Sequence, residues 1–424
     1  MTPSQLSPPV TRDRFLDLVR AVAILAVVAQ HWTMPVLDFA DGRITTGNAL
    51  TTPGWWIVTW LSQVMPLVFF AGGAANLMSL RRASSSRDWL ATRLRRLLLP
   101  ALPLLAVWLL VPRLLTDLGV PPQPVAVAGA IAAQLLWFLA VYLLTVLAAP
   151  LMAAAHRRFG VRVPLALACA AALVDIARFE GLGVLGYANA VFVWLAVHQL
   201  GFYYADGTLR RLSRRAALGL SAAGFACTAL LVAAGPYAAS MIGMPGAEVS
   251  NMSPPTLCLI SLAVGQISLV LAARPALEAF AGRPAVRGVL GWAGPRFMSI
   301  YLWHMPALVV VSGVTVLALD YATPVPGTLL WLAALPAWLT LTGLVLTGLL
   351  RLFGRFEARS WPAADAVPTW QLVAAGLLGS TGLLGLAATG FAASPSGWAV
   401  LVGGAFLLTG KTVTVRRRVA AEAA

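Results

Sequence analysis

The sequence predicts an all-α, polytopic integral membrane protein with about 12 transmembrane helices. Hydrophobic residues make up 59% of the chain and charged residues 11%, and the mean hydropathy is +0.83. Soluble domains carry about 25% charged residues. The net charge of +15 would suit nucleic acid, but nearly all basic residues lie in short loops beside apolar runs. Membrane topology explains that distribution, so we expect no nucleic-acid partner.

Apolar runs long enough to cross a bilayer recur from one end of the chain to the other. A spanning helix needs about 20 mostly apolar residues. The last run is the shortest of the set. The predicted spans lie near 15–37, 55–80, 97–116, 128–154, 163–179, 184–204, 215–235, 255–273, 290–318, 327–350, 369–391 and 396–410.

The arginines predict how these spans are oriented. Basic residues gather before the first span, after every even-numbered span and at the C-terminus, at 12–14, 81–96, 157–162, 210–215, 274–287, 351–359 and 411–418. The intervening loops hold only Arg43, Arg113 and Arg178. Because cytoplasmic loops are enriched in Lys and Arg, we expect a multi-pass protein of the inner (cytoplasmic) membrane with both termini in the cytoplasm.

The spans divide into a long core and a short C-terminal extension. We expect a cytoplasmic N-terminal tail over 1–14 and a membrane domain over 15–355. Two additional transmembrane helices then occupy 356–411, and a basic cytoplasmic tail occupies 412–424. Long loops are predicted at 38–54 and 236–254.

The first span, FLDLVRAVAILAVVAQHW, carries two ionisable residues with ten residues between them, Arg20 and His31. Eleven helical steps of about 100° and 1.5 Å place both on one face, roughly 16 Å apart, about the length of an extended pantetheine arm. Ionisable groups inside a spanning helix indicate function by default. A fixed cation and a titratable base so arranged predict a phosphate site and a general base. The alternatives are an Arg20 that reaches the interface beside Asp17 and a neutral His31 bonded to another helix.

Two further segments carry candidate residues. Arg93 and Arg96 stand at the head of the third span, where guanidinium groups suit phosphate oxygens, although a basic loop that sets topology explains them equally well. Tyr301 and His304 lie inside the ninth span as second-tier candidates, and His304 is either a second catalytic group or a packed histidine. The four histidines lack matching Cys or carboxylate spacing, so we expect no metal site.

Taken together in order, these residues resemble the integral-membrane acyltransferase family 3. The first span has the family's R-x10-H pattern at Arg20 and His31, after the LD-x-x-R start. The R-x-x-R-[LI]-x-x-P element is matched over 93–100, the LWFL stretch over 136–139 and the YLWH stretch over 301–304. The resemblance covers about residues 12–355.

The resemblance implies a membrane-embedded O-acyltransferase. An acyl group, most simply acetyl, would pass from acyl-CoA to a hydroxyl of a glycan, glycolipid or glycosylated metabolite. Arg20, Arg93 and Arg96 would bind the donor, and His31 would act as general base. An acyl-histidine intermediate is the less favoured variant. The second span departs from the family because Gly72 and Gly73 stand where a serine is common. We expect no appended SGNH-type domain.

A different class of function fits part of the same pattern. Twelve spans with cytoplasmic termini are also common in exporters, and His31, Asp175, Arg178 and His304 would then form a proton relay. Transporters are often built from two matched halves, and this sequence shows no internal repeat. The ordered motifs therefore favour an enzyme.

Overall fold

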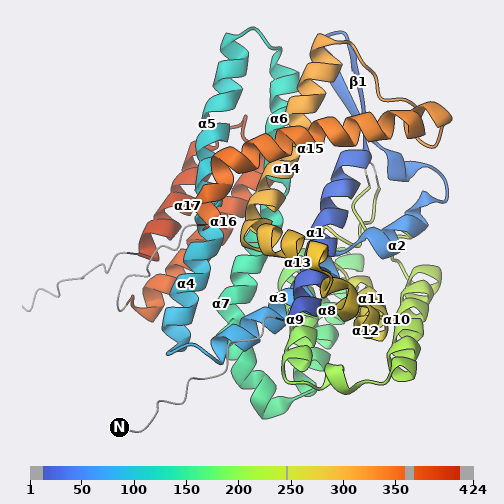
Figure 1. Ribbon diagram of the computed structural model, residues 1–424, viewed down its shortest axis with the longest axis vertical. Coiled ribbons are helices and arrows are strands. Elements are labelled where there is room, and N and C mark those ends of the chain that lie inside the picture. The colour runs from blue at the N-terminus through green and yellow to red at the C-terminus, as the bar shows by residue number, and fades with distance from the viewer. Residues whose placement is uncertain (1–12, 245–246, 359–366, 411–424) are drawn as a thin grey trace, which may run out of the picture.

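The computed structural model describes residues 13–244, 247–358 and 367–410. The predicted basic C-terminal tail and nearly all of the predicted N-terminal tail lie outside the described residues. Within the described part, the chain is a bundle of helices with one β-hairpin, as expected for an all-α polytopic membrane protein (Figure 1).

The first helix, α1 (Arg14–Thr33), leads directly into the hairpin. Its N-cap is Asp13, whose carboxylate accepts a hydrogen bond from the backbone N–H of Leu16. Strands β1 (Pro35–Ala40) and β2 (Arg43–Asn48) pair antiparallel, and the turn residues Asp41 and Gly42 have φ of 52° and 73°. The sequence predicted a loop here, but Asp-Gly favours the two-residue turn that closes a hairpin.

The remaining helices follow in chain order. The first half contains α2 (Thr59–Ser62), α3 (Met65–Leu80), α4 (Ser86–Leu98), α5 (Ala101–Asp117), α6 (Pro122–Gln134), α7 (Leu136–Phe159), α8 (Arg162–Phe179) and α9 (Asn189–Ala205). The second half contains α10 (Arg214–Ala234), α11 (Leu257–Ala272), α12 (Arg274–Ala281), α13 (Pro284–Ala293), α14 (Phe297–Ser312), α15 (Leu329–Ala358), α16 (Thr369–Thr389) and α17 (Ser396–Leu408).

The spans are close in number to the prediction. Of the described residues, nine helical segments are long and apolar enough to cross a membrane, and α11 with α12, bent by 63°, makes a tenth. The other two predicted spans are helices that fall short of these criteria. The 18 residues of α8 include Arg162, Asp175 and Arg178, and α17 has 13 residues. The multi-pass membrane character is confirmed at nine or ten spans.

The two ends of α1 lie at opposite faces of the protein. We call the end where α1 begins the basic face, because Arg14, Arg81, Arg82 and Arg210 line one cavity there. We call the other end, which carries β1 and β2, the hairpin face (Figure 1).

Close backbone packing fixes the helices around α1. Helix α1 packs against α3 and α14, and α3 packs in turn against α9. Gly73 of α3 and Gly201 of α9 sit at the second contact, where an added Cβ would overlap the carbonyl oxygens of His198 and Phe70. This close approach explains why small residues stand at Gly73 and Gly201.

The C-terminal helices α16 and α17 pack side by side and against α4 and α7, at the left of Figure 1. Ser380 of α16 donates a hydrogen bond to the carbonyl of Ala140 on α7 at 2.9 Å. Gln371 of α16 donates to the carbonyl of Leu408 on α17 at 2.6 Å. The first bond joins the extension to the core, and the second joins the two helices of the extension to each other.

Candidate active site

Three cavities follow α1 from the basic face toward the hairpin face. The first, which we call the vestibule, has a volume of about 760 Å³ and is lined by Arg14, Arg81, Arg82 and Arg210. The second, the inner cavity, has about 240 Å³, and Arg20 lines both it and the vestibule. The third, the outer cavity, has about 470 Å³ and contains His31. Arg20 and His31, on one face of α1, therefore line different cavities along the same helix.

The inner cavity brings together the three arginines that the sequence singled out. Arg20, Arg93 and Arg96 all line it, although they come from α1 and α4. Arg93 donates to the hydroxyl of Ser79 at 2.8 Å, and the guanidinium of Arg20 lies 5.2 Å from the centre of the Phe297 ring. These contacts hold two of the guanidinium groups in place.

One carboxylate shares the inner cavity with the arginines. The side chain of Glu357, on α15, accepts hydrogen bonds from the backbone N–H groups of Met298 (3.1 Å) and Ser299 (2.7 Å) at the start of α14. Both of its oxygens are thus engaged in capping α14. With three arginines and one carboxylate, the lining has a net charge of +2, which suits an anionic ligand.

His31 and His304 meet at the other end of α1, although 273 residues separate them in the chain. His31 Nδ1 lies 3.0 Å from His304 Nε2, and the two rings stack with centres 5.2 Å apart. His304 Nδ1 lies 2.6 Å from the carbonyl oxygen of Tyr301. The indole of Trp32 donates to the carbonyl of His304 at 2.9 Å, which fixes the backbone of the second histidine.

These contacts set the protons on both imidazoles. A carbonyl oxygen only accepts, so His304 Nδ1 carries the proton of its bond to Tyr301. His304 Nε2 is then an acceptor, and His31 donates to it from Nδ1. The lone pair of His31 Nε2 is left without a protein partner among the described residues, in a side chain that lines the outer cavity. That nitrogen is suited to take a proton from a ligand.

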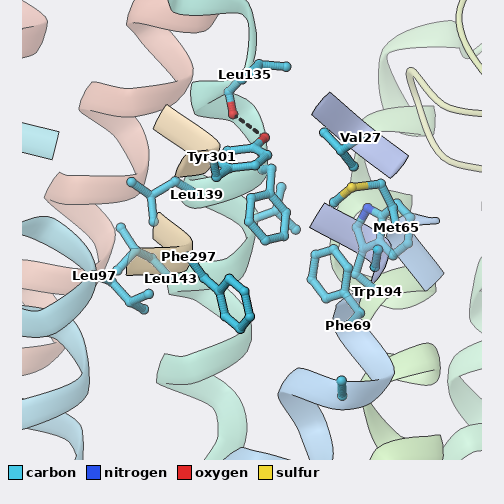
Figure 2. Close-up of a cluster of buried hydrophobic side chains, with 14 of the residues drawn as sticks. Val27, Met65, Phe69, Leu97, Leu135, Leu139, Leu143, Trp194, Phe297 and Tyr301 are labelled. Atoms are coloured by element: carbon cyan, nitrogen blue, oxygen red, sulfur yellow. Dashed lines mark hydrogen bonds between the residues drawn. The ribbon is translucent and has the colours of Figure 1, made fainter. Parts of the chain in front are cut away.

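The inner and outer cavities share a boundary. Val27, Met65 and Tyr301 line both of them. Figure 2 shows Val27 and Met65 on one side and Tyr301 on the other, with the Tyr301 hydroxyl bonded to the carbonyl of Leu135 at 2.9 Å. Leu135 lies at the break between α6 and α7, so its carbonyl is available to accept.

The outer cavity differs chemically from the inner one. Its described lining contains no Asp, Glu, Lys or Arg; its polar side chains include Gln30, Gln63 and Gln134, and its aromatic ones include Trp137 and Trp194. Neutral amides beside aromatic rings suit a neutral, hydroxylated ligand.

The comparisons with known proteins agree with this architecture. Residues 13–350 match the sequence model of a family described as an acyltransferase domain, acyltransferase family 3. The chain belongs to that family. No curated protein and no solved structure matches it. It is therefore a membrane acyltransferase, and the helices α16 and α17 lie beyond the matched residues.

Sequence reasoning missed three polar residues of this acyltransferase's inner cavity. These are Asn76, Tyr142 and Glu357. The ring and hydroxyl of Tyr142 occupy the space beside Gly72, where a Cβ would lie 2.6 Å from the hydroxyl oxygen. The chain thus presents a tyrosine hydroxyl close to the position where the family pattern often has serine. Of these three residues, only Glu357 has a recognisable sequence signal, because it is a lone glutamate at the end of an apolar helix.

Asn76 belongs to a buried pair. Its side-chain nitrogen lies 3.1 Å from His198 Nε2, and both residues are almost wholly buried. The amide nitrogen faces the histidine, so the amide oxygen points elsewhere, and within the described residues it makes no hydrogen bond. Because Asn76 lines the inner cavity, that oxygen is placed to accept a bond from a ligand there.

Other ionisable residues serve the structure. Asp175 accepts bonds from Asn189, Tyr237 and the backbone of Leu257, so it is engaged away from His31. His156 is only 8% exposed and lies 2.9 Å from Asp206, although its arginine-rich surroundings suggest a solvated side chain. Burial raises the pKa of Asp206, but hydrogen bonds from Thr208 and His156 outweigh that effect and hold the pKa below its usual value.

Proposed function

We propose that this family member is an O-acyltransferase that moves an acetyl or other short acyl group from acyl-CoA to a hydroxyl of a glycan, glycolipid or glycosylated metabolite. The observation that carries the proposal is the His31–His304 pair, with His31 in a neutral cavity that shares the lining residues Val27, Met65 and Tyr301 with an arginine-lined cavity. We propose the bacterial inner membrane as its location, with the basic face and both termini in the cytoplasm.

The arginines suit the donor. Acyl-CoA carries several phosphate charges at one end and a thioester at the end of a flexible arm. The net positive inner cavity and the arginines of the vestibule favour phosphates near the basic face. Arg20 and His31 are eleven helical steps apart, roughly 16 Å, which matches the pantetheine arm running beside α1 past Val27, Met65 and Tyr301. The thioester then reaches His31.

The chemistry follows from the proton arrangement of the two histidines. His31 Nε2 takes the proton of the acceptor hydroxyl, and the hydroxyl oxygen attacks the thioester carbonyl carbon. The C–O bond forms, the tetrahedral intermediate collapses, and the C–S bond breaks. The proton on His31 then passes to the departing CoA thiolate. His304 Nε2 accepts from His31 Nδ1 throughout and so stabilises the positive charge that develops on the His31 ring.

The outer cavity supports a neutral acceptor. Its described lining includes the amides of Gln30 and Gln134 and a buried hydroxyl of Ser62 that has no partner among the described residues. The amide of Gln63 is already bonded to Met65, Met241 and Met252. Amides and hydroxyls can bond sugar hydroxyls without requiring a counter-charge, and aromatic rings pack on the apolar faces of sugars. We therefore expect an uncharged polyhydroxylated group next to His31.

Label transfer from acetyl-CoA tests the proposal. Purified protein in detergent is incubated with acetyl-CoA labelled in the acetyl group and a lipid and glycan extract of cells that lack the gene. We expect label to enter the extract with wild type and the signal to fall to background with His31→Ala. His156→Gln, which removes an imidazole outside the three cavities, is the matched control and should retain transfer.

The same assay separates the competing chemistries. Transfer in detergent needs no gradient, so an enzyme is active there and a proton-coupled exporter is not. Label bound to the protein itself, lost in His31→Ala and passed on to the extract, would indicate an acyl-histidine intermediate in place of direct attack. Background label with wild type, or wild-type label with a correctly inserted His31→Ala, would contradict the proposal.

A further inference from the structure

The outer cavity has a wall that does not come from the matched acyltransferase domain. Leu384, Ala387 and Ala388 of α16 line the cavity that holds His31, whereas the family match ends at residue 350. The C-terminal extension is thus part of the chamber in which the reaction is proposed to occur.

Helix α16 is held firmly enough to act as a wall. Its Ser380 hydroxyl bonds to the carbonyl of Ala140, and both groups are buried. A Cβ at Gly379 would lie 3.1 Å from a methyl of Leu98, and one at Gly382 would lie 2.6 Å from the carbonyl of Trp398. Such close packing against α4 and α17 leaves α16 little freedom to shift.

The chemistry of the outer cavity is divided between its walls. The amides of Gln30 and Gln63 and the hydroxyl of Ser62 come from α1, α2 and the residues that follow α2. The α16 side chains in the cavity are purely aliphatic, and two of the three are alanines; Leu384, at 41%, and Ala388 are exposed, so the cavity reaches the protein surface here. The cavity thus combines polar side chains from α1, α2 and the end of α6 with a small aliphatic surface from α16.

We propose that this α16 surface receives the acyl chain of the donor thioester, and that Ala387 and Ala388 set the longest chain the enzyme accepts. The inference rests on the proposed function. When the thioester carbonyl is at His31, the arm fills the inner cavity behind it, so the acyl chain extends into the outer cavity. The hydroxylated acceptor binds the polar side chains of the cavity, and the aliphatic residues of α16 remain for the hydrocarbon.

The proposed role of α16 is tested by measuring donor affinity as a function of acyl-chain length. Acetyl-, butyryl- and hexanoyl-CoA are titrated by calorimetry into the full-length protein in lipid nanodiscs. Each methylene buried on α16 should tighten binding about fourfold until the cavity is filled. In Ala388→Phe the ring occupies that surface, so the gain from acetyl to butyryl should vanish while acetyl-CoA affinity stays within about twofold.

Two further variants keep the test decisive. Leu377→Phe is the matched control, because Leu377 lies eleven residues before Ala388 on the same face of α16, is 50% exposed and lines none of the cavities described here. It should leave the chain-length response unchanged. Ala387→Val makes a smaller change and should also shorten the acyl chain that binds best. It serves as the test if the Ala388→Phe protein does not insert into the membrane.

The outcomes distinguish the two proposals. In one outcome, the wild type binds longer donors more tightly, and Ala388→Phe and Ala387→Val leave this dependence on chain length unchanged. That result would overturn the proposed role of α16 in binding the acyl chain and leave the proposed function standing. Equal affinities of the three donors for wild type would do the same. Failure of wild type to bind any acyl-CoA would overturn both.

Discussion

Replacing His304 by alanine isolates the contribution of the second histidine. In the structure, His304 Nε2 accepts from His31 Nδ1 at 3.0 Å, and its own Nδ1 is fixed by the Tyr301 carbonyl at 2.6 Å. Without His304, the His31 ring can rotate and carry its proton on either nitrogen. The Nε2 lone pair then faces the acceptor hydroxyl for only part of the time.

The expected loss of kcat follows from the positive charge that develops on His31, which its hydrogen bond to His304 stabilises. A hydrogen bond to a group that becomes charged contributes about 1.5–3 kcal/mol. If that contribution is made in the transition state, His304→Ala should lower kcat roughly 10- to 150-fold. The KM for acetyl-CoA should stay within about twofold, because His304 lies outside the arginine-lined cavity. Label transfer under varied acetyl-CoA concentration measures both quantities.

A second substitution separates orientation from simple loss of packing. The amide oxygen of His304→Gln can accept from His31 Nδ1, so this variant should lose less than His304→Ala, within about tenfold of wild type. A kcat for His304→Ala within twofold of wild type would refute the reasoning. So would equal losses of kcat in the alanine and glutamine variants, since they would indicate damage to packing alone.

Two other predictions concern topology and the donor. In a variant whose native cysteines are replaced by alanine, cysteines at Ser86 and Ser213 should resist an impermeant thiol reagent in intact cells while one at Ala247 reacts, and the reverse pattern would contradict the proposed orientation. Asn76→Ala should weaken acetyl-CoA binding about two- to tenfold in calorimetry, because a cavity-facing amide oxygen is lost, and an unchanged affinity would remove Asn76 from donor recognition.

Features that depend on local periodicity were predictable from the sequence. Helical geometry alone places Arg20 and His31 on one face of α1, and in the structure they line two cavities that share part of their lining. The spacing of apolar runs likewise predicts most spans, because bilayer thickness fixes their length. The arginines of α4 were predicted as phosphate ligands from motif order, and the structure brings them beside Arg20.

Features that depend on contacts between distant segments were not predictable. A packed histidine and a catalytic partner look alike in sequence, so His304 stayed ambiguous until its ring lay against His31. The sequence marks Glu357 as a lone acid at the end of an apolar helix, but only the fold shows that its oxygens cap α14. The wall formed by α16 arises from helix packing that no local pattern specifies. The 63° bend between α11 and α12 was missed for the same reason.

The central claim is that α1 binds the donor at Arg20 and performs the chemistry at His31. Calorimetric titration of acetyl-CoA and of acetyl-pantetheine, which lacks the nucleotide, into wild type, Arg20→Ala and His31→Ala tests it most directly. Arg20→Ala should weaken acetyl-CoA binding roughly 10- to 150-fold and leave acetyl-pantetheine binding unchanged, while His31→Ala should bind both donors as wild type does. Equal acetyl-CoA affinity in wild type and Arg20→Ala would contradict the account.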